Sequence, residues 1–255
     1  MTCAIPKKLS HIWIGPKKPP IEWMNTWRQL HPDWEYTLYD NDFLFNRKFQ
    51  TQSQINEYLK RRQYAGVADL MRLEILYEHG GFMPGADSIC IRNMTALFSR
   101  AHAYTIYENE AVRGDLVSPI QACEPGNKFV KKLIDKLSET NISELDEPWI
   151  STGNLFTAQM IKSENPEITI FPSHYMIPIH YTGICYEGDG PIYAIQKFGS
   201  TPNEYQKEGY NSTPLLFRAL DYFAKRKAKI LNKNAISSIR KRRIESVMKK
   251  IHTIK

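Results

Sequence analysis

The chain has 255 residues, of which 42% are hydrophobic, 12% aromatic and 24% charged, and its formal net charge is +7. This length and composition suit a globular domain with a full core and exclude extensive disorder. No apolar run approaches the ~18 residues that would cross a membrane, and the first residues lack the apolar core of a signal peptide.

The first expected elements are two strands around a helix. Residues 5–14 end in an apolar run before Gly15-Pro16, which predicts a buried strand that stops at a turn. We expect a helix over 20–30, a strand over 34–39, where aromatic and polar residues alternate, and a loop over 40–42.

The clearest helical pattern covers residues 64–78. Its apolar residues recur at helical spacing, and Asp69 and Arg72, three residues apart, share another face. Gly80-Gly81 predicts the end of the helix, because glycine tolerates the left-handed cap. Short strands over 82–83 and 88–91 should then flank an acidic turn.

The rest of the chain alternates strands and helices up to about residue 200. Alternation of this kind predicts an α/β fold with a largely parallel central sheet. We expect strands at 103–107, 116–122, 168–171 and 191–195, and helices at 127–137 and 155–161.

The positive charge is concentrated at the C-terminus. Residues 218–255 hold 13 Lys or Arg and 2 Asp or Glu, whereas the rest of the chain has a net charge of −4. We therefore expect a main domain over 1–214 and a basic amphipathic helical tail over 215–255. The tail favours an anionic membrane surface over self-association, and self-association over nucleic acid.

The four cysteines are far apart and form no CxxC pair, so a zinc site is not expected. Free thiols in a reducing compartment are the simplest interpretation, which favours a cytoplasmic protein.

Two sequence blocks carry a resemblance. The first reads IPKKLSHIWIGPKKPP and continues to HPDWEYTLYDND, and the second combines Asp69 and Arg72 with Gly80-Gly81. Together they resemble the family 32 glycosyltransferases, which include bacterial capsule and O-antigen transferases and yeast α-mannosyltransferases. A more distant likeness is to the clostridial glucosylating toxins. The resemblance covers residues 5–200 and implies a GT-A fold, a Rossmann-like nucleotide-sugar-binding sheet.

The resemblance also assigns donor-binding roles. Ile12 and Trp13 match the block that holds the nucleotide base, although Trp13 alone could be a core aromatic. Asp69 matches the aspartate that hydrogen-bonds the donor sugar or ribose, and Arg72 the arginine near the diphosphate. Taken alone, this pair could be a surface salt bridge. Further donor contacts are expected from Gly81, Ala86, Lys197 and Ser200.

Asp87 matches the second aspartate of the family's DxD motif, which contacts a divalent cation, Mn²⁺ or Mg²⁺, between the phosphates. On its own it could be a turn aspartate. The first position of the motif is Gly85, which has no ligand atom. Two more family positions differ, since Gln196 replaces a histidine and Thr201 a tryptophan. One carboxylate could suffice for the metal, the metal could be dispensable with Lys197 or another basic group offsetting the charge, or the protein could bind without catalysis.

The implied activity is retaining transfer of a sugar from a nucleotide diphosphate sugar, UDP-sugar in preference to GDP-sugar, to a glycan. A lipid-linked acceptor in capsule, O-antigen or other surface polysaccharide synthesis would explain the basic tail, which would hold a cytoplasmic protein on the inner face of the membrane. The acceptor side could include Ser118, His174, His180 and Asp189. The alternative is an inactive nucleotide-sugar-binding protein of the same fold; a nucleic-acid partner is not expected.

Overall fold

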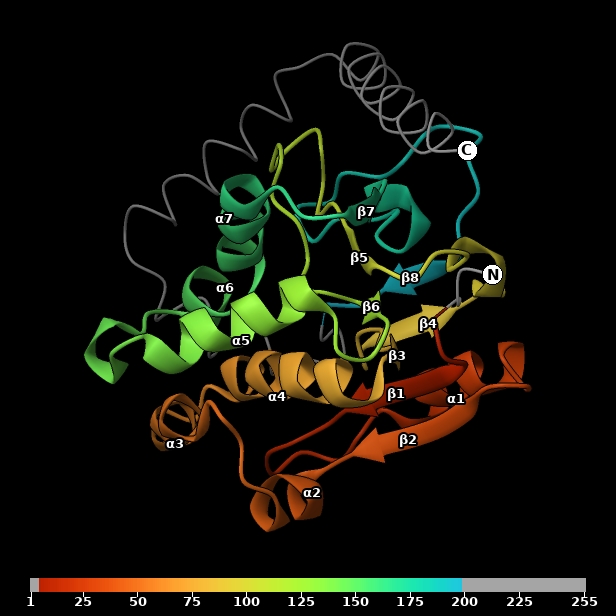
Figure 1. The fold of residues 1–255 in the computed structure, drawn as a ribbon. Coiled ribbons are helices and arrows are strands. Elements are labelled where there is room, and N and C mark those ends of the chain that lie inside the picture. The colour runs from red at the N-terminus through yellow and green to blue at the C-terminus, as the bar shows by residue number, and fades with distance from the viewer. Residues whose placement is uncertain (1–4, 199–255) are drawn as a thin grey trace.

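The computed structural model describes residues 5–198. A six-stranded sheet forms its centre, with strand order β2-β1-β3-β6-β5-β7 (Figure 1). Only β6 runs antiparallel to its neighbours. The predicted α/β fold with a largely parallel sheet is therefore confirmed. The strands are β1 Lys8–Ile12, β2 Glu35–Tyr39, β3 Gly81–Phe82, β5 Ala103–Ile106, β6 Ala122–Cys123 and β7 Ile168–Phe171.

A small second sheet pairs β4 with β8 in antiparallel fashion. These strands are Ser88–Cys90 and Ala194–Gln196, so the pairing joins the acidic turn to the end of the described chain. The helices are α1 Ile21–Leu30, α2 Asn41–Asn46, α3 Gln52–Lys60, α4 Tyr64–His79, α5 Lys128–Glu139, α6 Pro148–Ser151 and α7 Asn154–Glu164, and the short 3-10 turns are Thr95–Leu97, Ile142–Glu144 and Ser173–Tyr175.

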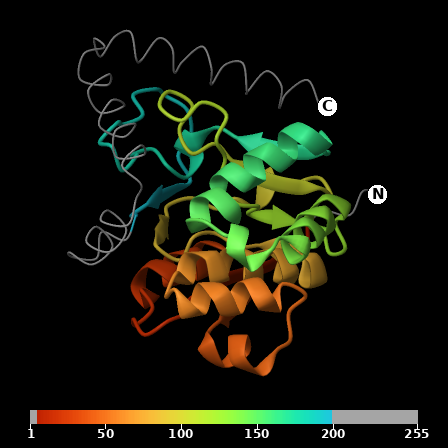
Figure 2. The ribbon, with the colours of Figure 1, turned by 90° about the vertical axis from the view of Figure 1, so that its left-hand side faces the viewer.

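Apolar side chains cover both faces of the central sheet. One cluster joins α3, α4 and α5 to the sheet through residues such as Ile55, Leu70 and Leu133. The other packs α1 and the segments after β3 and β7 on the sheet through Trp27, Phe82 and other aromatic residues. The N-terminal third, in red and orange, lies below the later green and blue segments in Figure 2.

The predicted strands and helices of residues 5–39 and the long helix of 64–78 are confirmed as β1, α1, β2 and α4. The loop expected over 40–42 is wrong. The Asp40 carboxylate accepts a hydrogen bond from the Phe43 N–H at 3.1 Å and so caps α2, which begins at Asn41. Aspartate is a favoured helix N-cap, a role that competes with its preference for turns.

The strand expected over 116–122 is mostly wrong, because only Ala122 and Cys123 form β6. The preceding segment still runs beside β5: the Ser118 N–H donates to the Ile106 carbonyl at 2.8 Å. Pro119 has no N–H to donate, so a regular ladder does not continue through it. The strand expected over 191–195 is shifted to Ala194–Gln196.

Within the described residues, no helix combines the length and the apolar character needed to cross a membrane. The basic tail over 215–255 lies outside residues 5–198, so the predicted domain boundary and tail helices stay predictions.

Candidate functional site

The carboxyl end of β1 carries the first candidate residues. Ile12 is buried, whereas Trp13 is partly exposed. The Trp13 backbone N–H donates to the Tyr39 carbonyl at 2.9 Å, and its indole N–H donates to the Lys17 carbonyl at 2.7 Å. The side chain is therefore fixed at the edge of the sheet where α/β folds bind nucleotides.

The turn after β1 is braced by two helices. The Gly15 N–H donates to Asn41 Oδ1 at 2.8 Å, and Asn41 Nδ2 donates back to the Gly15 carbonyl at 3.0 Å, which ties the turn to α2. A Cβ at Gly15 would lie 3.0 Å from the Tyr64 ring, and its φ of +96° favours glycine. The turn thus lies directly against the first residue of α4.

Asp69 lies on the second turn of α4 and accepts a hydrogen bond from the Thr152 hydroxyl at 3.0 Å. Gly153 leaves little space beside it, since a Cβ added there would lie 3.1 Å from Asp69 Oδ2. Burial raises the pKa of Asp69 to about 7, although the Arg72 charge and the Thr152 hydroxyl both lower it. A carboxylate with so perturbed a pKa is typical of a functional site.

Arg72 does not form the surface salt bridge that its spacing from Asp69 allows. Its Nη1–H donates instead to the Met83 carbonyl, just after β3. Burial lowers the pKa of Arg72, while the charges of Asp69 and Asp87 raise it. The guanidinium therefore lies between the helix and the acidic turn, within electrostatic reach of both carboxylates.

Asp87 faces the C-terminal end of the described chain. The Gln196 amide donates to Asp87 Oδ1 at 2.6 Å, and the Lys197 backbone N–H donates to the Asp87 carbonyl at 2.8 Å. A Cβ at Gly85 would lie 3.2 Å from both Asp87 Oδ1 and Gln196 Oε1. Two of the family positions that differ in sequence, Gly85 and Gln196, thus lie next to each other beside Asp87.

The remaining expected donor residues do not all gather here. Ala86 lies in the acidic turn and is partly buried, and Lys197 follows β8. Gly81 is in β3, where a Cβ would lie 2.4 Å from the Lys8 carbonyl. Because Lys8 begins β1 and Trp13 follows its other end, the structure does not bring Gly81 to the site; its small size serves strand pairing. Ser200 lies outside the described residues.

His11 is a residue of this region that the sequence reasoning did not assign. It is fully buried, and its Nδ1 lies 3.2 Å from the Tyr36 hydroxyl. Burial and the nearby Arg72 charge lower the pKa of His11 to about 3, so the ring is neutral near pH 7. A neutral imidazole beside Arg72 adds no positive charge to that of the guanidinium.

A buried polar cluster around the Glu108 carboxylate lies past the end of β5, and the sequence did not predict it. Glu108 Oε2 accepts from Asn154 Nδ2 at 2.9 Å, and Glu108 Oε1 lies 3.2 Å from His180 Nε2 and 3.4 Å from Arg113 Nε. Asn154 follows Gly153, where an added Cβ would lie 3.1 Å from Asp69 Oδ2, so this cluster adjoins the site. No sequence motif links these four residues, because Asn154 and His180 come from segments far from the loop that holds Glu108 and Arg113.

The residues expected on the acceptor side are in different environments. His180 belongs to the Glu108 cluster. His174 is buried and stacks on Tyr186 with ring centroids 4.1 Å apart. Ser118 is held against β5 through its backbone, and Asp189 is exposed. Of the four, His180 is linked to Asp69 through Glu108, Asn154 and the adjacent Gly153.

A divalent cation, implied by the DxD resemblance, fits these residues poorly. In the part of the chain that the structure describes, no three His, Cys, Asp or Glu side chains come together as a metal site. Mg²⁺ and Mn²⁺ need several oxygen ligands. Gly85 supplies none, and Asp87 Oδ1 already accepts the Gln196 amide N–H.

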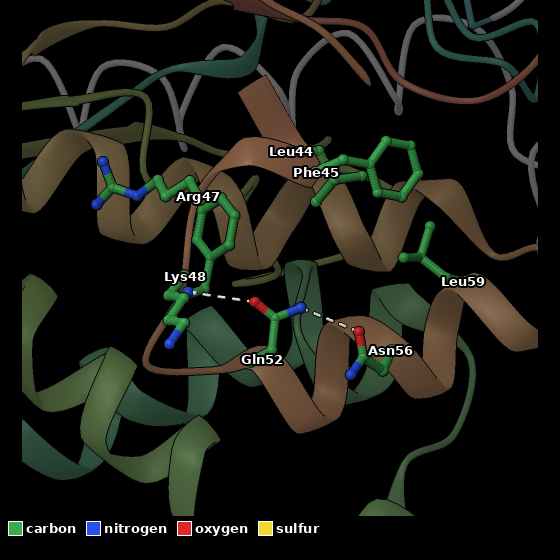
Figure 3. Close-up of a pocket in the computed structure, with 8 residues that line it drawn as sticks. Leu44, Phe45, Arg47, Lys48, Gln52, Asn56 and Leu59 are labelled. Carbon is green, nitrogen blue, oxygen red and sulfur yellow. Dashed lines mark hydrogen bonds between the residues drawn. The ribbon is translucent and has the colours of Figure 1, made fainter. Parts of the chain in front are cut away.

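Two surface hollows lie elsewhere. One, of about 460 Å³, lies between α2 and α3 and is lined partly by Phe45, Arg47 and Leu59 (Figure 3). The other, of about 560 Å³, is lined by residues of α1 and β2, including Arg28 and Tyr36. Neither is lined by Asp69, Arg72 or Asp87, so neither belongs to this site.

Comparisons with known proteins agree with this geometry. Residues 20–105 match the family model described as "glycosyltransferase sugar-binding region containing DXD motif", and this range contains Asp69, Arg72 and Asp87. No curated protein sequence matches the chain. A solved structure titled "PaToxG Glycosyltransferase" is similar, with a TM-score of 0.52 and 18% identity over 63% of this chain and 70% of that one. This likeness confirms the GT-A-like fold.

Proposed function

We propose that this chain, a glycosyltransferase of the DXD-containing sugar-binding family, transfers a sugar from a nucleoside diphosphate donor to a glycan with retention at the anomeric carbon. The observation that carries the proposal is the convergence of Asp69, Arg72 and Asp87, from one helix and one turn, beside the carboxyl ends of β1 and β3. The base-binding role of Ile12 and Trp13 belongs to the same proposal.

Arg72 is the group suited to the departing diphosphate. Arginine binds phosphate oxygens in a planar, two-point manner, and the Met83 carbonyl holds this guanidinium in a fixed orientation. A fixed positive charge near developing negative charge lowers the barrier most when the site is dry. Partial burial of Arg72 supplies that environment.

Asp69 is the group suited to orienting the donor sugar. Its carboxylate accepts a hydrogen bond from Thr152. A side chain at position 153 would crowd the carboxylate, and the glycine there leaves that space open. Hydrogen bonds to sugar hydroxyls at this position would fix the anomeric carbon relative to an incoming hydroxyl. Retention then follows from front-face attack, in which the leaving diphosphate helps to remove the acceptor proton.

The divalent cation that proteins of this family generally bind supplies charge to the diphosphate when present. The residues around Asp87 do not provide its ligand shell, so the roles above are assigned to side chains of this chain alone.

The finer proposal is a UDP-sugar donor and a lipid-linked acceptor in bacterial surface polysaccharide synthesis, at the inner face of the membrane. The support is the positive charge of residues 218–255, which contain 13 Lys or Arg and only 2 Asp or Glu. Such a segment is attracted to anionic lipid. Full-length protein should sediment with vesicles that contain an anionic lipid and not with neutral vesicles. Replacing Arg240, Lys241, Arg242 and Arg243 with glutamine should weaken this binding; binding of the same strength would contradict the membrane assignment.

The activity is tested by incubating the protein with UDP- and GDP-sugars and measuring nucleoside diphosphate release. Wild type should hydrolyse at least one donor slowly without acceptor, and Asp87→Ala should be slower. If both proteins are inert with every common donor, the alternative of an inactive nucleotide-sugar-binding protein gains the support instead.

A further inference from the structure

The Asp87 carboxylate has an unusual neighbour for a residue expected to bind a cation. The Gln196 side-chain amide donates to Asp87 Oδ1 at 2.6 Å. Because an ionised carboxylate only accepts hydrogen bonds, the amide must present its N–H to Asp87 and direct its oxygen elsewhere.

This contact is set by the backbone. Gln196 is opposite Ser88 in the β4–β8 pair, and the Lys197 N–H donates to the Asp87 carbonyl at 2.8 Å. The Gln196 N–H in turn donates to the Met176 carbonyl at 3.0 Å. Hydrogen bonds on both sides thus hold the Gln196 backbone, and with it the amide, next to Asp87.

Gly85, which stands at the first carboxylate position of the DxD motif, lies beside the same Asp87–Gln196 contact. A Cβ at Gly85 would lie 3.2 Å from Asp87 Oδ1 and 3.2 Å from Gln196 Oε1, so a side chain at Gly85 would compete with the amide. The backbone of Gly85 is not among those with positive φ, so an aspartate could stand there without backbone strain. The glycine at position 85 therefore leaves the space in which the Gln196 amide contacts Asp87.

Arg72 supplies positive charge near Asp87. Arg72 acts electrostatically on Asp87 as well as on Asp69, and its Nη1–H is anchored on the Met83 carbonyl at the start of the acidic turn. The negative charge of Asp87 is thus offset by the Gln196 amide N–H and by the Arg72 guanidinium. The amide occupies space at the carboxylate, and the guanidinium repels a second cation there.

We infer that this chain binds its sugar diphosphate without a divalent cation, because the Gln196 amide takes the cation's position at Asp87 and Arg72 supplies the positive charge. The inference rests on the proposed function, since it concerns the same donor site.

The test measures the affinity of full-length protein for UDP and for GDP by calorimetry, once with EDTA and once with 1 mM Mn²⁺. The wild-type affinity should change by less than about 2-fold between the two conditions. An affinity more than 10-fold higher with Mn²⁺ would overturn the inference and leave the proposed function standing. If neither nucleotide binds in either condition, the proposed function fails and this inference with it.

Gln196→Glu is the matched variant, because it replaces an amide nitrogen with an oxygen and keeps the shape of the side chain. It should place two carboxylates together and create a cation site, so that Mn²⁺ alone raises its melting temperature while that of wild type is unchanged. Gly85→Asp should gain the same response from an independent position. A wild type that Mn²⁺ stabilises as much as these variants would contradict the inference.

Discussion

The two halves of the candidate site are built in different ways. Asp69 and Arg72 lie three residues apart on one 16-residue helix, so the helical period alone places them near each other. Asp87 and Gln196 are 109 positions apart and meet only because β4 pairs with β8. The helix half is therefore fixed by local structure, whereas the turn half depends on tertiary pairing.

The carboxylates of the two halves also have different chemical surroundings. On α4 the carboxylate is partly buried and its pKa is raised to about 7, and its neighbours are a hydroxyl and a guanidinium. In the turn the carboxylate is held by an amide on a neighbouring strand. Changes at Asp69 and Arg72 should therefore affect donor binding and turnover, while changes at Gly85 and Gln196, beside Asp87, should affect the response to metal.

Asp69→Asn should have the largest effect. It keeps an oxygen that can accept from Thr152 but removes the charge beside Arg72. Donor turnover should fall by about 100-fold or more, as expected when a group that orients the reacting centre is lost. Initial rates of nucleotide release measure the effect. A loss of less than about 3-fold would remove the helix half from the proposed mechanism.

Arg72→Met should weaken binding of UDP by about 10- to 100-fold, because the phosphate loses a charged, two-point partner. Arg72→Lys keeps the charge without the planar fork and should lie between Met and wild type. Calorimetry gives the dissociation constants. Phe45→Ser, a change at an exposed side chain of the α2–α3 hollow, is the control and should leave UDP binding unaltered. Equal loss in all three variants would point to misfolding.

The raised pKa of Asp69 predicts a pH dependence of stability. The carboxyl binds its proton more tightly in the folded protein than in the unfolded chain, so Asp69 lowers the free energy of unfolding as the pH rises from about 4 through about 7. The full cost, on the order of 1–4 kcal/mol, is present above pH ~7. Asn at this position has no such cost.

Thermal unfolding of wild type and Asp69→Asn at pH 5, 6, 7 and 8 measures this dependence. The stability advantage of Asn over wild type should grow with pH across the series. An advantage that stays constant with pH would mean that the carboxyl titrates at its ordinary value.

Thr152→Val should have the smallest effect of the series. It removes the hydroxyl that lies 3.0 Å from both Asp69 Oδ2 and the Pro148 carbonyl and leaves the shape nearly unchanged, at a cost of about 1–3 kcal/mol. Thr152→Ser retains the hydroxyl and is the matched control. Denaturant unfolding compares the two; the same stability for Val and Ser would show that the hydroxyl contributes nothing to holding Asp69.

The sequence predicted the helix half well because its features are local. The apolar spacing and Gly80-Gly81 bound α4, and the separation of Asp69 and Arg72 follows from it. It did not predict that Arg72 bonds Met83, because that contact spans the helix and the following strand. The spacing alone favoured a salt bridge.

The turn half and the Glu108 cluster were beyond local patterns. Gln196 could be noted as a departure from the family pattern, but only the β4–β8 register shows that it faces Asp87. Glu108 joins Arg113 of its own loop to Asn154 and His180 from two other segments. The capping role of Asp40 was missed because aspartate favours turns and helix starts alike.

A structure of the full chain with bound UDP tests the central claim most directly. The account predicts that the diphosphate contacts the Arg72 guanidinium, with the base against Trp13 and the phosphate end toward Asp87. Nucleotide bound in the hollow between α2 and α3, or anywhere that leaves Asp69 and Arg72 untouched, would contradict it.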